Sequence, residues 1–226
     1  MKETKGLNGI YDFLGGYKFN LISPSSKFFL SLGLSMTITG KLLPSPFSLI
    51  SLAIGVLILY SYDIWRPERV IHESALIGDL KKIKNCLKSG LDINIKDFSG
   101  VTALHYAAKG GQLEVGELLI NNGADINLSM NSQGGPPLSW AILFKKNQFM
   151  ELLISKGANI NTSDEKQRSP LHLAAWSGNL YAVRYLVNHD SDINSRMFNN
   201  KTPLTLAKEK GYSDIINFLI QNSAIE

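Results

Sequence analysis

The sequence predicts an all-α protein, in which a solenoid of about five helix-turn-helix units follows one or two transmembrane helices. Three observations support this prediction. A five-residue motif occurs four times, and its last residues (Asn94, Asn127, Asn161 and Asn194) stand 33, 34 and 33 residues apart. A second motif, first seen as TALHYAA at 102–108, recurs in phase with it. Finally, the 21 residues 42–62 carry no charge until Asp63. A fixed period of this length is typical of units that stack on one another.

Charge divides the chain into two parts. Of the net charge of +4, residues 1–70 carry +3 and residues 71–226 carry +1. A nearly neutral second part does not resemble a phosphate-binding surface, so we expect no nucleic acid partner. Cys86 is the single cysteine, which excludes an internal disulfide and fits a reducing compartment.

Residues 1–27 form a polar, glycine-containing segment, and residues 28–65 are predicted to be a membrane anchor. A helix over the uncharged residues 42–62 would be about 31 Å long, close to the thickness of the bilayer core. Pro44 and Pro46 confine this helix to about residues 45–65. Tyr60, Tyr62 and Trp65 lie in its last turns and Arg66 follows it, in the order expected at a membrane surface.

The anchor has one span or two. Residues 28–40 are apolar and lie between Lys27 and Lys41, but a helix of about 20 Å is too short to cross a bilayer alone. Extended to residues 28–43, it could pair with 45–65 as a helical hairpin. We favour the hairpin because it leaves the lysines before it and the arginines after it on the same, cytoplasmic side. A signal peptide and a soluble helical cap on the repeats are the two other interpretations of this region.

Each later unit is expected to contain two short helices. Thr102 or Ser169 can cap the first helix, and Pro170 and Pro203 suit its first position because proline has no N–H to satisfy. Glycines end this helix at 110–111, 178 and 211. An apolar second helix follows, and the GADIN-type motif then leads the chain to the next unit.

These motifs resemble the ankyrin repeat: TPLHxAA, a glycine, an apolar helix and GADIN, at a period of 33. The resemblance covers about two-thirds of the chain. It implies an ankyrin repeat domain over residues 66–226, with units at about 66–94, 95–127, 128–161, 162–194 and 195–226. The third unit departs from the pattern, with Ser139 in place of histidine and one extra residue.

No catalytic motif is recognised, and we expect no enzyme activity, cofactor or metal. His72, His105 and His172 share one repeat position, and the resemblance implies that each imidazole bridges backbone groups. Residues 1–70 contain neither histidine nor cysteine, which speaks against acyl-transfer or metal chemistry in that region.

The resulting interpretation is an integral membrane protein whose cytoplasmic ankyrin domain is a scaffold or adaptor for another protein. An exported or periplasmic tethered protein is one alternative, and a recruitment subunit of a membrane enzyme complex is another. In the exported alternative, the helix at residues 45–65 would hold the protein to the membrane.

The ankyrin resemblance implies that a partner binds the concave face and the turn tips. At these positions the sequence places apolar residues and one arginine, a composition typical of interface hot spots. The predicted contact residues are Phe98, Val101, Leu143, Phe144, Arg168, Trp176 and Phe198. Two other interpretations remain: the irregular third unit buries Leu143 and Phe144, or the patch covers the protein's own N-terminal segment.

Overall fold

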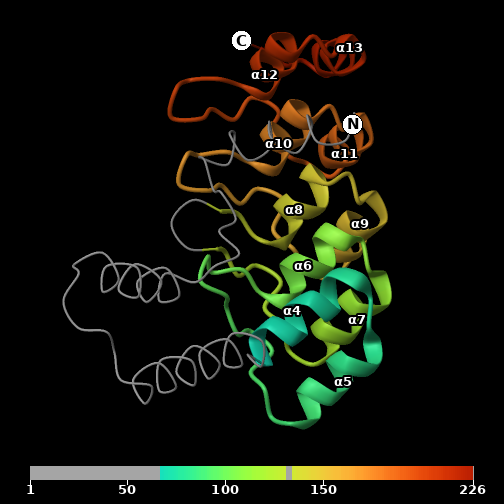
Figure 1. Ribbon diagram of the computed structural model, residues 1–226. Helices are drawn as coiled ribbons and strands as arrows, with labels where there is room; N and C mark the ends of the chain where they lie inside the picture. The colour runs from blue at the N-terminus through green and yellow to red at the C-terminus, as the bar shows by residue number, and fades with distance from the viewer. Residues whose placement is uncertain (1–66, 131–133, 226) are drawn as a thin grey trace, which may run out of the picture.

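A computed structural model of the protein describes residues 67–130 and 134–225, and within these ranges every regular element is a helix. The described helices, labelled as in Figure 1, are α4 (Pro67–Ile77), α5 (Leu80–Lys88), α6 (Ala103–Gly110), α7 (Leu113–Asn121), α8 (Pro137–Leu143), α9 (Asn147–Ser155), α10 (Pro170–Ser177), α11 (Leu180–Val187), α12 (Pro203–Lys210) and α13 (Ser213–Gln221). They form five consecutive pairs, as the repeat period predicts.

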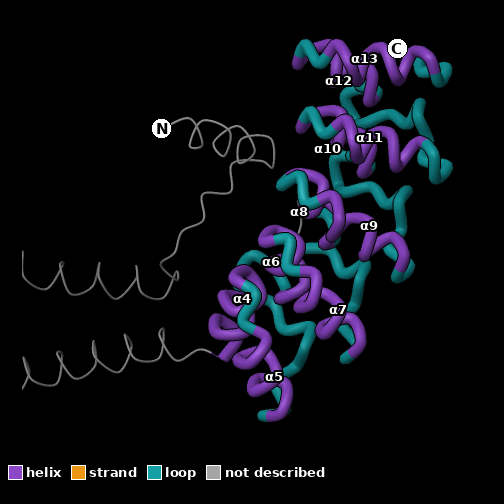
Figure 2. The backbone as a smooth tube through the Cα atoms, turned by 90° about the vertical axis from the view of Figure 1, so that its right-hand side faces the viewer, coloured by secondary structure: helices purple, strands orange, loops and turns teal. Residues whose placement is uncertain are grey.

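The pairs stack into a solenoid with two columns of helices (Figures 1 and 2). The first helices of the units form an inner column, in which each helix packs on the next: α4 on α6, α6 on α8, α8 on α10 and α10 on α12. The second helices form an outer column in the same order. Loops that precede the inner helices project from the side of the inner column (Figure 1).

The inner helices begin and end as the sequence predicts. Ser169 accepts a hydrogen bond from the backbone N–H of His172, and Pro170 occupies the first helical position. The glycine that follows each of three inner helices adopts the left-handed conformation, which costs a residue without a Cβ little. These residues are Gly111, Gly178 and Gly211, with φ of 75°, 66° and 73°.

The repeated histidines join each inner helix to the loop of the next unit. The Nδ1 atom of His105 accepts from the backbone N–H of Thr102 at 3.3 Å, and its Nε2 donates to the Gly135 carbonyl at 3.3 Å. The Nε2 atoms of His72 and His172 lie 3.1 Å from the carbonyl oxygens of Ile95 and Lys201. The bridging role implied by the ankyrin resemblance is therefore confirmed.

The repeated asparagines make the second set of bonds between units. Within each motif the residue two positions earlier accepts the N–H of the asparagine: Asp92 accepts from Asn94 at 2.9 Å. The asparagine oxygen then accepts a backbone N–H of the next unit. These bonds join Asn94 to Asp125 (2.9 Å), Asn127 to Asn159 (2.9 Å), Asn161 to Asp192 (3.4 Å) and Asn194 to Ile225 (2.8 Å).

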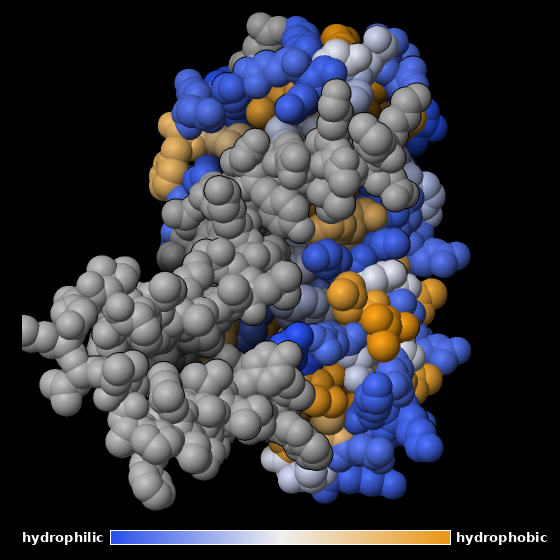
Figure 3. All heavy atoms as spheres, in the orientation of Figure 1, coloured by the Kyte–Doolittle hydropathy of each residue, from blue (hydrophilic) through white to orange (hydrophobic). Residues whose placement is uncertain are grey.

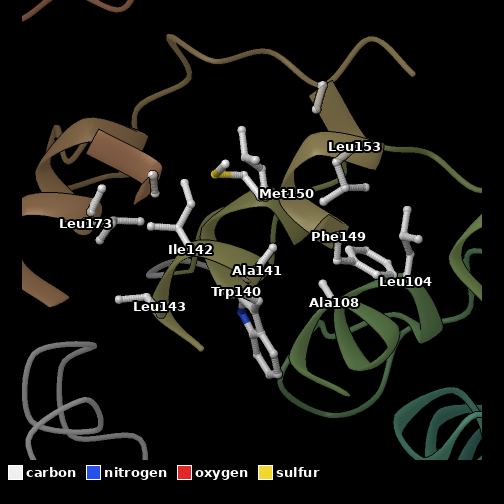
Figure 4. Packing of buried hydrophobic residues seen from close by; sticks show 14 of the residues in the cluster. Leu104, Ala108, Trp140, Ala141, Ile142, Leu143, Phe149, Met150, Leu153 and Leu173 are labelled. Atoms are coloured by element: carbon white, nitrogen blue, oxygen red, sulfur yellow. The ribbon is translucent and has the colours of Figure 1, made fainter. Parts of the chain in front are cut away.

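One hydrophobic cluster runs through the described units (Figure 4). Small residues allow the close approach of neighbouring units. The paired alanines of α6 and α10 are fully buried. In the outer column, Gly116 of α7 faces the ring of Phe149 from the next unit, and a Cβ there would come within 2.6 Å of the ring. The core therefore depends on contacts across unit boundaries rather than on any single pair of helices.

The third unit differs from its neighbours at the end of its inner helix. Lys145 stands where the other units have a glycine, and its φ is 54°. The fourth unit shows a similar departure at Asp190, where φ is 63° and the sequence pattern expects glycine. A side chain in this region of φ costs roughly 1–2 kcal/mol.

The predicted membrane anchor at residues 28–65 lies outside the residues that the structure describes. Among the helices of residues 67–130 and 134–225, none has the length and apolar content to cross a membrane.

We predict that Lys145→Gly stabilises the ankyrin domain by roughly 0.5–1 kcal/mol, because glycine adopts the left-handed conformation without the Cβ clash. The measurement is urea-induced unfolding of residues 66–226, followed by circular dichroism. Lys156→Gly is the matched control, because Lys156 ends α9 with φ of −93° and glycine gains nothing there. A loss of stability in Lys145→Gly would contradict the explanation.

We also predict that the domain loses stability as the pH falls below about 6.5. Burial lowers the pKa of His105 to about 3, and burial also lowers the pKa of His72 and His172. Below the ordinary pKa of about 6.5 the unfolded chain binds protons that the folded chain does not bind, so acid favours unfolding. The stability that the neutral ring contributes is therefore present above pH 6.5 and is lost between about pH 6.5 and 3.

The test of this prediction compares His105→Gln with the unsubstituted domain at several pH values. Between pH 6 and 5 the variant should show a slope of unfolding free energy against pH that is smaller by roughly 1 kcal/mol per pH unit. His189→Gln changes an exposed ring and serves as the control. Equal slopes for His105→Gln and the unsubstituted domain would be inconsistent with a buried neutral imidazole.

Candidate protein-interaction surface

The inner helices and the loop tips form the inner face, on which most of the predicted contact residues were expected. On the part of the described surface that is visible in Figure 3, hydrophobic residues lie scattered among hydrophilic ones.

The two phenylalanines at loop tips are the most accessible of the predicted contact residues. Phe98 precedes α6 and is 64% exposed, whereas Phe198 precedes α12 and is 75% exposed. They belong to the second and fifth units and so lie three repeat steps apart, about 30 Å if each step adds roughly 10 Å. The expected exposure is confirmed for both side chains, but they belong to separate parts of the inner face.

An aromatic cluster joins the second and third units. Trp140 meets Tyr106 edge to face, with 6.0 Å between ring centroids, and lies 5.9 Å from Phe144. The Nζ atom of Lys109 lies 5.3 Å from the Phe144 centroid and 5.8 Å from that of Trp140, within cation-π range. Lys109 is half-buried, and this burial lowers the pKa of its amine. Phe144, a predicted contact residue, is thus half-buried in this cluster.

Hydrogen bonds fix the polar ends of the cluster. The Tyr106 hydroxyl donates to Asp97 at 2.9 Å, and the indole N–H of Trp140 donates to the sulfur of Met130 at 3.2 Å. Burial raises the pKa of Tyr106, and the neighbouring Asp97 carboxylate adds to the rise, so the hydroxyl remains a donor. The cluster is therefore a fixed arrangement and not a set of loose surface rings.

A second aromatic contact lies in the fourth and fifth units. The Nζ atom of Lys210 lies 5.0 Å from the ring centroid of Trp176. Trp176 is half-buried and packs against the hydrophobic cluster of the stack. Only part of this ring is open to a partner.

Val101 and Arg168 are buried, which corrects the expectation that a partner contacts them. Both close the loop before an inner helix. The backbone N–H of Val101 donates to Asp97 at 2.9 Å, and that of Arg168 donates to Asp164 at 2.9 Å. The Arg168 side chain also forms an ion pair with Asp164, with 2.5 Å between Nε and Oδ2. This arginine is 2% exposed, and its role is to hold the loop.

Leu143 also differs from the expected exposure, because only 2% of its surface is accessible. It is the last residue of α8 and belongs to the hydrophobic cluster shown in Figure 4. The alternative that the irregular third unit buries Leu143 is therefore correct. The third unit, in which Leu143 is buried, has two other irregular features: its inner helix has only seven residues, and Lys145 adopts the left-handed conformation.

Tyr106 and Trp140 are not among the predicted contact residues, because those residues were taken from the loop tips and from the positions after the alanine pair. Both follow the histidine position, and the repeat register places Leu173 and Leu206 there in later units. Metal binding has no candidate site in the described part of the chain, where no group of three His, Cys, Asp or Glu side chains is close enough.

Comparison with known proteins identifies the family. A family model described as ankyrin repeats, in three copies, matches residues 71–164 and 144–226. These matches cover more than half of the chain, and the protein belongs to the ankyrin repeat family.

Individual relatives share the repeats at low identity. Rabankyrin-5 of Homo sapiens is 28% identical over 66% of this chain, and the B-cell lymphoma 3 protein homolog of Mus musculus is 32% identical over 59%. Palmitoyltransferase akr1 of Schizosaccharomyces pombe is 33% identical over 61%. The matched regions are 13%, 30% and 22% of the length of these three relatives. Palmitoyltransferase relatives match only in the ankyrin region, not in a catalytic domain.

Proposed function

We propose that the protein is a membrane-anchored scaffold that binds another protein through the inner face of its ankyrin domain. Residues 28–65 hold it in the membrane, and the ankyrin domain lies on the cytoplasmic side. The partner contacts the loop tips around Phe98 and Phe198 and the exposed edges of Phe144 and Trp176. No catalytic step is assigned to the protein itself.

The exposed loop tips are the observation that carries the binding proposal. Large aromatic side chains at the surface are the residues that most often dominate binding energy at protein interfaces. Phe98 and Phe198 are respectively 64% and 75% exposed, although the stack offers a large core in which such rings could be buried. The ankyrin repeat itself is a module for protein-protein interaction, which supports the same role.

Support for the anchor comes from the sequence alone. The uncharged residues 42–62 are long enough to span a bilayer as a helix, and aromatic and basic residues follow them. The lysines before the hairpin and the arginines after it favour a cytoplasmic ankyrin domain. An exported, membrane-tethered protein is the alternative topology.

A second candidate function is recruitment of a membrane enzyme or its substrate. It is favoured by the match between this ankyrin domain and the ankyrin region of relatives named as palmitoyltransferases. In this version the partner of the inner face is a component of a membrane enzyme complex. The chemistry belongs to that complex and not to this chain.

The anchor is tested by alkaline carbonate extraction of membranes from cells that express the full chain. We predict that the protein stays in the membrane pellet, because a spanning helix is not released by high pH. A chain without residues 28–65 is the control and should be released. Release of the full chain would rule out a spanning anchor. If the chain stays in the pellet, protease digestion of sealed membranes shows on which side the ankyrin domain lies.

Partner binding is tested with the double variant Phe98→Ala and Phe198→Ala. We predict that it weakens capture of a partner by more than tenfold, since interface aromatics contribute about 2 kcal/mol or more each. Its melting temperature should change little, because exposed side chains contribute little to the core.

The matched control is Tyr181→Ala, which removes a 49% exposed aromatic ring from the outer helix α11. It should leave capture unchanged. Equal capture by the double variant and the unsubstituted protein would move the binding site away from the loop tips.

A further inference from the structure

Helix α5 differs from the other outer helices in its charge. Its nine residues, LKKIKNCLK, include four lysines and no acidic residue. The outer helices α7 and α9 contain glutamates and no basic residue, and α11 contains one arginine. Positive charge of the outer column is therefore concentrated on the first unit.

The lysines of α5 lie on the side opposite its buried residues. Ile83 is fully buried, whereas Lys81, Lys84 and Lys88 are exposed. Their spacing of three and then four residues aligns them along one stripe of the helix. In the described part of the chain none of these three lysines forms an ion pair, whereas Lys82 pairs with Asp79 at 3.3 Å. The stripe is thus a set of three uncompensated charges on a rigid helix.

The position of α5 brings this stripe near the expected membrane anchor. Helix α4 begins at Pro67, two residues after the expected end of the anchor at residue 65. The two-residue turn Gly78–Asp79 reverses the chain, so that α5 packs on α4 and runs back toward its start. Lys88 therefore lies beside the beginning of α4, and Lys81 lies about 10 Å further away along α5.

We propose that the stripe of Lys81, Lys84 and Lys88 docks on anionic lipid headgroups of the membrane that holds residues 28–65. This inference rests on the proposed anchor and adds a second, electrostatic contact with the same membrane. Basic residues beside a membrane span are attracted by anionic lipids, with a gain of roughly fivefold in the binding equilibrium for each lysine. Docking fixes the orientation of the stack and leaves the loop tips available to a protein partner.

The experiment uses the full chain in vesicles of phosphatidylcholine alone or with phosphatidylserine added. A fluorophore is attached at Asn85→Cys in a Cys86→Ser background, because Asn85 is exposed between Lys84 and Lys88 and Cys86 is the only cysteine. Spin-labelled headgroups present at the same level in both kinds of vesicle quench the fluorophore when α5 lies on the surface.

Quenching should be stronger in the vesicles that contain phosphatidylserine, and 1 M salt should remove the difference, since the screening length falls to about 3 Å. The difference in quenching between the two kinds of vesicle should also disappear in the triple variant Lys81→Gln, Lys84→Gln and Lys88→Gln. A control variant removes the same charge from three exposed lysines of the third and fifth units: Lys145→Gln, Lys156→Gln and Lys210→Gln. This control should keep the phosphatidylserine-dependent difference in quenching. Equal quenching in both kinds of vesicle, or an unchanged signal in the α5 variant, would overturn the proposal.

Carbonate treatment of the same vesicles separates failure of the docking from failure of the anchor. A chain that resists extraction but shows no phosphatidylserine-dependent quenching keeps its anchor and has no lipid contact at α5. A chain that is extracted, yet shows the dependence before extraction, has the lipid contact without the spanning helix. Among single variants, Lys88→Gln should reduce quenching more than Lys81→Gln because Lys88 lies beside the start of α4, and the reverse order would contradict the proposed orientation.

Discussion

The stack depends on one recurring contact, in which an asparagine side chain accepts a backbone N–H of the following unit. The contact joins residues 31 or 32 positions apart, close to the repeat period. A unit of two helices of 7–11 residues is too short to be stable by itself. Stability must therefore come from interactions between neighbouring units. These interactions are the asparagine bonds, the histidine bridges and the shared hydrophobic core.

The interaction surface follows from the same geometry. In the first, second and fourth units a histidine joins the inner helix to the next loop. The residue after this repeat position is Tyr106 in the second unit and Trp140 in the third, and the two rings pack against each other across the unit boundary in the aromatic cluster. The loop tips carry the exposed phenylalanines beyond these rings. A rigid inner side with accessible tips is well suited to binding a protein without a large change of its own shape.

The repeat fold could be predicted from the sequence, because local rules determine it. Proline at the first helical position, glycine in the left-handed position and histidine at a fixed step each have one structural role, and the described units confirm them. Side-chain exposure was harder to predict, because it depends on contacts between distant residues. Leu143 was expected at the surface, yet it is buried where the third unit departs from the pattern, and the ion pair with Asp164 holds Arg168 inside its loop. The membrane anchor stays a prediction from length and charge, since its residues lie outside the described ranges.

Native-state hydrogen exchange of Asn127→Ala tests whether the asparagine bonds couple neighbouring units. The substitution removes the 2.9 Å bond to the N–H of Asn159, at a cost of about 1 kcal/mol. Asn122→Ala, whose side chain bonds the Leu118 carbonyl within its own unit, is the control. Amide protection in Asn127→Ala should divide at the boundary between the second and third units, whereas the control should exchange as one block. Uniform protection across that boundary in Asn127→Ala would contradict this coupling.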